Sequence, residues 1–280
     1  MIFLRLPFAL VTFCLLSATT FAQTVHLSNG VTAHRGYSAA YPENTMTAFR
    51  EGIMSGADWV ELDIHKTSDG KIVVSHDGKT GRTSGKDLII ANSTYKELQE
   101  LDVATEFRTL KGLTLKECPI QRMPLLEDAL KLILNHKRSK LSIQPKADCV
   151  ADAIRIVRKL NAEHMVGFND ASLKYMSQVK ELAPAIPVFW DRGPDTDINK
   201  DILIAKEKGF ETLVINYKGI NPDKVQRVKD AGLKVGTWTV SDKENLEQFI
   251  KLGLDRIYTD NPVLLIALKK SQVLKINGRN

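Results

Sequence analysis

The sequence predicts an α/β protein, a (β/α)8 TIM barrel with a small insertion after the second strand. Short β-rich runs alternate with longer stretches of helical periodicity, which is typical of parallel strands joined by crossover helices. Eight strands and eight helices alternate in this way, as a closed barrel requires. No G-x-G-x-x-G motif follows a strand, which disfavours an open dinucleotide-binding sheet.

The expected strands are short and evenly spread along the chain. They cover Val31 to His34, Trp59 to His65, Lys140 to Gln144, Met165 to Phe168, Pro187 to Trp190, Thr212 to Asn216, Lys234 to Thr239 and Arg256 to Thr259. Helical periodicity fills the intervals, over Thr45 to Ser55, Leu125 to Asn135, Val150 to Asn161, Ser172 to Leu182, Ile198 to Lys208, Pro222 to Ala231, Lys243 to Lys251 and Pro262 to Lys269. Glycine follows several helix ends, and proline opens two helices, at Pro222 and Pro262.

One stretch, at about residues 70–123, interrupts the alternation. It predicts a hairpin strand over Lys71 to Ser75 and one short helix near Tyr95 to Leu101. Serine, threonine and glycine gather between Thr80 and Gly85, which is typical of turns. We expect this insertion to cover one rim of the barrel.

The first 22 residues have the composition of a secretory signal peptide. Arg5 is their only charged side chain, Leu6 to Leu16 is almost wholly apolar, and small residues at Thr20 and Ala22 fit a cleavage site. The apolar run is shorter than the ~20 residues of a membrane-spanning helix, which disfavours an uncleaved anchor. We therefore expect an exported chain, periplasmic or secreted, in which residues 23–280 form the barrel domain without stable membrane insertion.

Composition and charge narrow the function classes. The chain of 280 residues is 43% hydrophobic and 26% charged, as in an ordinary folded protein. Its formal net charge of +6 is scattered rather than gathered into a basic stripe, so nucleic acid is not an expected partner. Cys118 and Cys149 are expected to be free thiols, because a domain of this size needs no disulfide. The sequence carries no signal for an oligomeric state.

Polar side chains gather at the carboxyl ends of the expected strands, where the active sites of such barrels lie. They come from the first strand, the second strand, the hairpin and the third long strand: His34, Arg35, Glu61, Asp63, His76, Gln144 and Lys146. His65 lies on the face of the second strand's carboxylates and is expected to line the site. The other histidines are interpreted as surface or packing residues, namely His26, His136 and His164.

Glu61 and Asp63 are two positions apart on one strand and therefore point into the barrel together. Two inward carboxylates repel each other and lose hydration, so a hard divalent cation such as Mg²⁺ or Ca²⁺ would stabilise them. The alternative is that they form ion pairs with Arg35 or Lys146 and bind no metal. The sequence does not choose between Mg²⁺ and Ca²⁺.

His34 and His76 are candidates for acid–base catalysis, because imidazole titrates near neutral pH. Their place beside the two carboxylates favours this over a purely structural role. Arg35 and Lys146 are suited to holding a phosphate, the first through its guanidinium fork and the second as a compact charge.

These residues also carry a resemblance to the glycerophosphodiester phosphodiesterase family, in motifs that run from His34 to Pro262. The segments are HRGYSAAYPENTMTAF, VELDIHKTSDGKIVVSHD, MPLLEDAL, TWTV and DRIYTDNP. The resemblance implies a TIM barrel with an insertion after strand two. It also implies metal-dependent hydrolysis of small-molecule glycerophosphodiesters to glycerol phosphate and an alcohol.

The resemblance further implies roles for single residues. They concern acid–base catalysis (His34 and His76), metal binding (Glu61 and Asp63) and phosphate contact (Arg35 and Lys146). Glu43 and Asn44 belong to the PENT motif and are expected to hold the site loop and support these residues. Trp238 lines the substrate pocket by resemblance; the alternative is that it packs in the core.

Gln144 departs from the family pattern, which offers a glutamate here as a further metal ligand. A glutamine carbonyl still coordinates a hard cation, but the site loses one negative charge. We therefore expect weaker metal binding, and tighter binding in a Gln144→Glu variant.

Two other functions stay open. One is a phospholipase-like enzyme on intact lipids, which would need an apolar rim, whereas the insertion is mostly polar. The other is a catalytically impaired homologue that binds phosphodiesters. Substrate choice is expected to depend on side chains at the barrel mouth, among them Phe168, Asn169, Trp190 and Tyr217.

Overall fold

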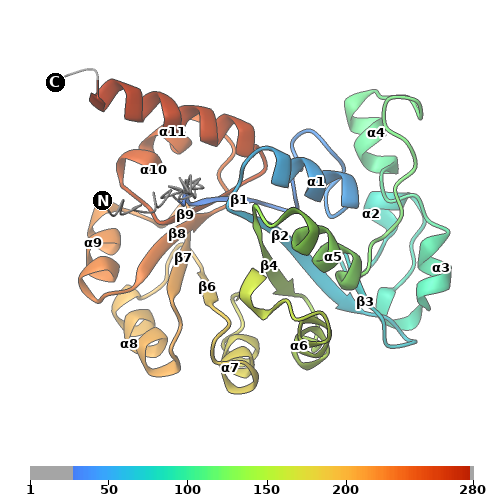
Figure 1. The fold of residues 1–280 in the computed structure, drawn as a ribbon, viewed down its shortest axis with the longest axis horizontal. Coiled ribbons are helices and arrows are strands. Elements are labelled where there is room, and N and C mark those ends of the chain that lie inside the picture. The colour runs from blue at the N-terminus through green and yellow to red at the C-terminus, as the bar shows by residue number, and fades with distance from the viewer. Residues whose placement is uncertain (1–27, 278–280) are drawn as a thin grey trace, which may run out of the picture.

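The computed structural model describes residues 28–277 and shows a closed barrel (Figure 1). Parallel strands follow one another in the sheet order β1-β9-β8-β7-β6-β5-β4-β2, and β1 pairs with both β9 and β2, which closes the ring. The strands are β1 (Val31–Ala33), β2 (Trp59–Lys66), β4 (Lys140–Pro145), β5 (Val166–Asp170), β6 (Val188–Arg192), β7 (Thr212–Asn216), β8 (Lys234–Trp238) and β9 (Arg256–Thr259). The predicted TIM barrel is confirmed.

Helices surround the strands on the outside of the ring (Figure 1). They are α1 (Met46–Met54), α5 (Leu126–His136), α6 (Val150–Lys159), α7 (Leu173–Leu182), α8 (Ile198–Lys208), α9 (Pro222–Asp230), α10 (Lys243–Lys251) and α11 (Pro262–Asn277), with the short 3-10 turn η2 (Glu163–Met165) before β5. The side chain of Asn221 caps α9, and Gly209 ends α8 with a φ of 71°. None of the described helices is long and apolar enough to cross a bilayer.

The segment between β2 and α5 forms a small lobe beside the barrel, on the right in Figure 1. It starts with β3, antiparallel to β2, and has its own apolar cluster around Ile90 and Leu98. Its elements are β3 (Ile72–Val74), α2 (Gly81–Ser84), η1 (Ile90–Asn92), α3 (Tyr95–Gln99) and α4 (Thr105–Lys111). The expectation of a single helix was therefore incomplete. Helices α2 and α4 bury no residue, so hydrophobic periodicity could not reveal them.

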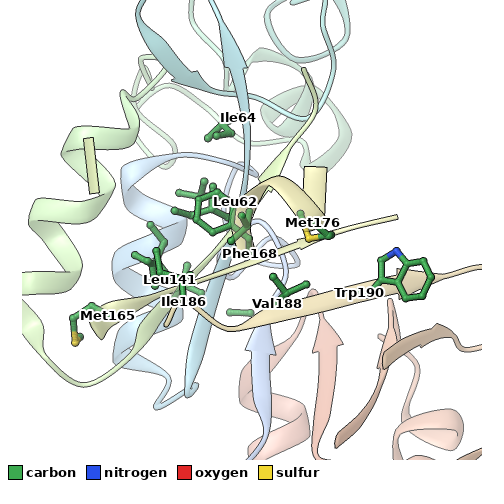
Figure 2. Close-up of a cluster of buried hydrophobic side chains, with 14 of the residues drawn as sticks. Leu62, Ile64, Leu141, Met165, Phe168, Met176, Ile186, Val188 and Trp190 are labelled. Atoms are coloured by element: carbon green, nitrogen blue, oxygen red, sulfur yellow. The ribbon is translucent and has the colours of Figure 1, made fainter. Parts of the chain in front are cut away.

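The main core lies between the strands and the surrounding helices. On β2, Val60, Leu62 and Ile64 are fully buried in this layer, while Glu61 and Asp63 point to the interior. Figure 2 shows Phe168 and Trp190 packed in the same apolar layer, and Trp190 meets Phe210 edge-to-face with ring centroids 5.6 Å apart.

This packing corrects one expectation about the barrel mouth. Phe168 and Trp190 belong to the outer core, and Tyr217 packs against it, so these three do not line the mouth. Of the four side chains expected there, only Asn169 faces the cavity. Alternation along β5 and β6 explains this, because inward and outward positions exchange at every residue.

Inside the ring, apolar side chains pack together and reach the cavity, which Tyr258 lines. Phe189, Val214 and Tyr258 form a buried cluster there, and the guanidinium of Arg256 stacks 3.5 Å from the Phe189 ring centroid. Side chains therefore fill the barrel interior, and its polar residues face a cavity at the carboxyl ends of the strands.

Two expectations concern the ends and the thiols of the chain. Residues 1–22, interpreted as a signal peptide, and His26 lie outside the described residues. Cys118 and Cys149 are both buried and free, as expected. His136 is half-buried at the end of α5, and His164 is exposed in η2.

Candidate active site

A cavity of about 360 Å³ opens at the carboxyl ends of the strands. It brings together seven of the predicted site residues: His34, Arg35, Glu61, His76, Gln144, Lys146 and Trp238. Asp63 lies against this cavity, fully buried, and Asn44 lies behind it. The structure therefore brings these predicted residues together at the carboxyl ends of the strands, the end of the barrel where chemistry is expected.

The loop after β1 adopts an unusual backbone. Arg35 has a φ of 53° and Gly36 a φ of 82°. A Cβ atom on Gly36 would lie 2.6 Å from the backbone of Ala48, so only glycine fits this turn. The turn directs the Arg35 N–H to Glu61, whose Oε2 accepts it at 2.8 Å. Backbone strain of this kind is common at functional sites.

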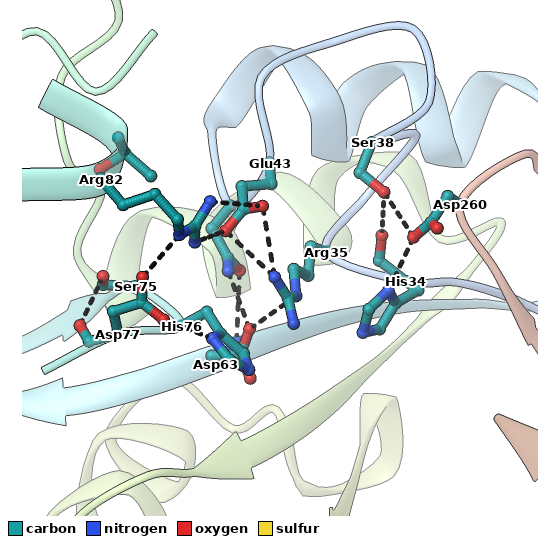
Figure 3. A network of polar contacts seen from close by, with 12 residues as sticks. His34, Arg35, Ser38, Glu43, Asp63, Ser75, His76, Asp77, Arg82 and Asp260 are labelled. Atoms are coloured by element: carbon teal, nitrogen blue, oxygen red, sulfur yellow. Dashed lines mark hydrogen bonds and ion pairs between the residues drawn. The ribbon is translucent and has the colours of Figure 1, made fainter. Parts of the chain in front are cut away.

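His34 is held by the half-buried carboxylate of Asp260, which directly follows β9. Its Nδ1 lies 2.7 Å from Asp260 Oδ1, and Ser38 and Ser241 donate to the same carboxylate (Figure 3). Because a carboxylate only accepts, Nδ1 carries the proton and Nε2 is left for the cavity. Burial lowers the pKa of His34, but Asp260 and Glu61 outweigh it and the pKa is raised. The His34 hydrogen bond holds the Asp260 pKa at about 2, against the effect of burial.

His76 has a similar arrangement on the other side of the site. Its Nδ1 lies 2.7 Å from Asp77 Oδ1, which again leaves Nε2 free (Figure 3). Arg82 of the lobe donates to Asp77 at 2.6 Å, to Glu43 at 2.6 Å and to Glu106 at 3.0 Å. Arg82 therefore ties the His76 loop to the PENT loop and to α4.

Asp63 lies between two cations. Lys146 Nζ is 3.2 Å from its Oδ1, and Arg35 Nε is 3.5 Å from its Oδ2. Asn44 donates to the same carboxylate at 2.8 Å and accepts the Asp63 N–H. Burial would raise the pKa of Asp63, but Lys146 and Arg35 hold it below its usual range. The expected alternative, an ion pair with Arg35 or Lys146, is thus present at Asp63.

Glu61 accepts the Arg35 backbone N–H but forms no ion pair with a described side chain. Its Oε1 is buried without a hydrogen-bond partner, and the side chain is 1% exposed. Burial and the Asp63 carboxylate raise its pKa above the usual range. An unpartnered buried carboxylate oxygen is costly on its own and fits a cation ligand.

Gln144 faces two carboxylates from the neighbouring strands. Its Nε2 lies 3.3 Å from Asp170 Oδ2 and 3.3 Å from Asp191 Oδ2. Asn169 donates to Asp191 as well, at 3.2 Å. Burial raises the pKa of Asp191 to about 8, and Asp170 and Glu61 add to the effect. Neither aspartate was predicted from the sequence.

Comparison with known proteins identifies the family of this chain. The family model described as glycerophosphoryl diester phosphodiesterase matches residues 34–264. The chain belongs to this family. By family it is a phosphodiesterase, and the resemblance inferred from the motifs is confirmed.

Individual relatives cover nearly the same span. A glycerophosphodiester phosphodiesterase of Caldanaerobacter subterraneus subsp. tengcongensis is 32% identical over 249 residues, 85% of this chain and 96% of that protein. A solved glycerophosphodiester phosphodiesterase of Parabacteroides distasonis has a TM-score of 0.72 at 25% identity, covering 87% of this chain and 98% of the other. A phosphodiesterase of Oleispira antarctica, solved with the product sn-glycerol-3-phosphate, has a TM-score of 0.71 at 23% identity, covering 85% and 95%.

The sequence missed several residues that shape this family member's site. Asp260 and Asp77 stand within quoted motifs, and their position after a strand or a histidine was the available signal. Asp170 and Asp191 were missed because β5 and β6 were expected to end two residues earlier, at Phe168 and Trp190. Extending the alternation to the true ends would have placed Asp191 inward.

Two predicted lining residues need comment. His65 does not line the cavity; it is buried under the His76 loop, with Nε2 3.2 Å from the His76 carbonyl oxygen, and burial lowers its pKa. Trp238 combines both of its expected roles. It lines the cavity and also packs against the cluster of Phe189 and Tyr258 inside the ring.

Proposed function

We propose that this protein hydrolyses glycerophosphodiesters to glycerol phosphate and an alcohol, by acid–base catalysis at His34 and His76 with a divalent cation. The observation that carries the proposal is the pair of histidine–aspartate contacts, each 2.7 Å long, at one cavity. The relatives named for this activity, and the product complex of the Oleispira enzyme, support the substrate class.

The two histidines provide the proton transfers. In each, the aspartate fixes the Nδ1 proton, so Nε2 accepts a proton when the ring is neutral and donates one when it is protonated. One histidine removes a proton from the attacking group, which is water or the substrate's own glycerol hydroxyl. The other protonates the leaving alcohol. Because both histidines have the same contact from Nδ1 to an aspartate, either can act as the acid or as the base.

Arg35 and Lys146 are placed to bind the phosphate. Both line the cavity and both contact Asp63, which fixes their positions. A phosphate between them would exchange part of these ion pairs for contacts to its own oxygens. They would then stabilise the negative charge that increases in the transition state.

The residues present fit a divalent cation. The free buried oxygen of Glu61 is the type of ligand that hard cations prefer, and the Gln144 amide offers a carbonyl oxygen. Glu61, Asp63 and Gln144 would hold Mg²⁺ or Ca²⁺, which when bound neutralises phosphoryl charge. Within residues 28–277, no three histidine, cysteine or acidic side chains form a metal-binding group by themselves.

One observation favours a second candidate, an enzyme on intact lipids. Three apolar side chains of the lobe are strongly exposed: Leu110 at 76%, Leu115 at 60% and Ile120 at 50%. Leu110 also lines a groove with Glu43 and Arg82 next to the site. The lobe is therefore less polar than its sequence indicated. An exported chain acting on lipids or on their breakdown products is consistent with the leader sequence.

A panel of substrates tests the proposal. Purified protein with Mg²⁺ or Ca²⁺ is incubated with glycerophosphodiesters of several head groups and with intact phospholipids in vesicles. Release of glycerol phosphate from the former supports the proposal. Hydrolysis of the vesicle lipids alone would favour the second candidate. Binding of glycerophosphodiesters without any turnover would favour the impaired binding homologue.

A further inference from the structure

The charges around the cavity are unevenly compensated. Among the side chains that line it in the described chain, only Arg35 and Lys146 are permanently cationic. Both form an ion pair with Asp63, and Arg35 also forms one with Glu43. The acidic side chains of Glu61, Asp170 and Asp191 also face the cavity, and none of the three forms an ion pair within the described residues. Buried carboxylates in this state require a further positive charge.

Asp191 is the clearest of these groups. Its side chain is 5% exposed, and its Oδ1 has no hydrogen-bond partner. Its other oxygen, Oδ2, is held in place by donors from Gln144 and Asn169. Asn169 is itself fixed by Ser142, which donates to its Oδ1 at 2.7 Å. The free oxygen thus belongs to a positioned carboxylate on a strand, rather than to a mobile loop.

Gln144 connects this carboxylate to the family's metal position. Asp63 and Gln144 are register partners on β2 and β4, so their side chains leave the same face of the sheet. The Gln144 amide nitrogen is occupied by Asp170 and Asp191, since carboxylates accept only from N–H groups. Within the described residues the amide oxygen accepts no hydrogen bond, which leaves it free for a cation.

We propose that Asp191, supported by Asp170, supplies the negative charge that a glutamate at position 144 would bring, and that it binds the divalent cation together with Glu61 and the Gln144 carbonyl. The negative charge would then come from β6, two strands along the barrel from position 144 on β4. The inference rests on the proposed function for the cation itself, and it adds a ligand that the family motifs do not contain.

The test is a calorimetric titration of the whole chain, freed of metal by chelator, with Mg²⁺ or Ca²⁺ alone and no substrate. Asp191→Asn keeps the shape of the side chain and removes its charge. We expect it to weaken cation binding about tenfold or more, the effect typical of changes around metal ligands. Asp148→Asn is the matched control, because it removes the same charge from an exposed aspartate that contacts only Lys174, and it should bind as the wild type does.

Two further variants keep the test decisive. Adding Gln144→Glu to Asp191→Asn restores a carboxylate in the neighbouring position and should recover most of the affinity. Asp170→Asn changes a less buried residue that folding tolerates more readily, and it should weaken binding by a smaller factor, about threefold. Thermal melting in chelator checks that each variant is folded.

The outcomes separate this inference from the proposed function. Wild-type affinity in folded Asp191→Asn would overturn the inference, as would the absence of cation binding to the wild type. The proposed function depends instead on release of glycerol phosphate, which is measured in parallel. Product release by the wild type alongside unchanged cation binding in Asp191→Asn would therefore refute only the role of Asp191.

Discussion

The two sides of the cavity balance their charges in different ways. On the β1–β2 side, Asp63 has two cations and an amide donor, and His34 has a carboxylate of its own. On the β4–β6 side, Asp170 and Asp191 are contacted by neutral amides and form no ion pair with a described residue. Asp63 and His34 are thus compensated by other side chains of the protein, whereas Asp170 and Asp191, together with Glu61 of β2, have the excess of negative charge expected of a cation site.

Because of this difference, substitutions on the two sides should affect stability and function differently. Motif residues on the β1–β2 side position one another, so their substitution should damage both structure and activity. The carboxylates on the other side repel one another. Their removal should therefore raise the free energy of unfolding of the metal-free protein while weakening cation binding. Such a conflict between stability and function is common at active sites.

The largest effect is expected at the histidines. His34→Ala and His76→Ala each remove an acid–base group, and we expect kcat to fall by about a hundredfold or more. Steady-state release of glycerol phosphate measures this. His164→Ala, an exposed histidine in η2, is the control and should keep wild-type turnover. Near-wild-type turnover in either of the first two variants would contradict acid–base catalysis by this pair.

Unfolding in urea with chelator compares the two sides directly. Asp63→Asn leaves Arg35 and Lys146 without their carboxylate and should lower the free energy of unfolding by about 3 kcal/mol. Asp191→Asn removes an uncompensated buried charge and should raise the free energy of unfolding by about 1 kcal/mol. If both substitutions changed the free energy of unfolding in the same direction, the proposed difference in charge balance between the two sides would be wrong.

The His34–Asp260 pair predicts a pH effect. Asp260→Asn removes the contact that raises the His34 pKa, so burial should then lower that pKa. NMR titration of the imidazole measures it. Ser241→Ala removes only one donor to Asp260 and should shift the pKa far less. An unchanged His34 pKa in Asp260→Asn would show that the carboxylate does not control the imidazole.

The same pair sets a pH window for stability. The His34 pKa is raised above its usual 6.5, so its stabilisation is complete below pH 6.5 and is lost as pH rises through the folded-state pKa. The Asp260 pKa is lowered from 3.8 to about 2, so its stabilisation is present above pH 3.8 and is lost as pH falls towards 2. Asp260→Asn should therefore cost most stability between these limits, as measured by urea unfolding across the pH range.

The smallest effect is expected at Arg82, which links the lobe to the site. Arg82→Ala should leave the fold intact and lower kcat several-fold, because Asp77 and Glu43 lose a shared donor and the His76 loop is held less firmly. Lys79→Ala, an exposed neighbour, serves as the control. A loss as large as that of His76→Ala would indicate that Arg82 contacts the substrate.

Sequence reasoning found the fold and the motif side of the site for a physical reason. Strand and helix periods alternate regularly, and Glu61 and Asp63 share one face by strict alternation. The positions of Asp170 and Asp191 depend on where β5 and β6 end, and strand ends are the weakest signal in a sequence. The contacts of Gln144 with both aspartates depend on side-chain geometry across three strands. A local sequence pattern does not predict such contacts.

The most direct test of the central claim is ³¹P NMR of the purified protein with a glycerophosphodiester, first with chelator and then with Mg²⁺ or Ca²⁺ restored. We expect no turnover in chelator and release of glycerol phosphate once the cation is added, because the β4–β6 carboxylates require it. Equal turnover in chelator, or no glycerol phosphate under any condition, would contradict a cation-dependent phosphodiesterase.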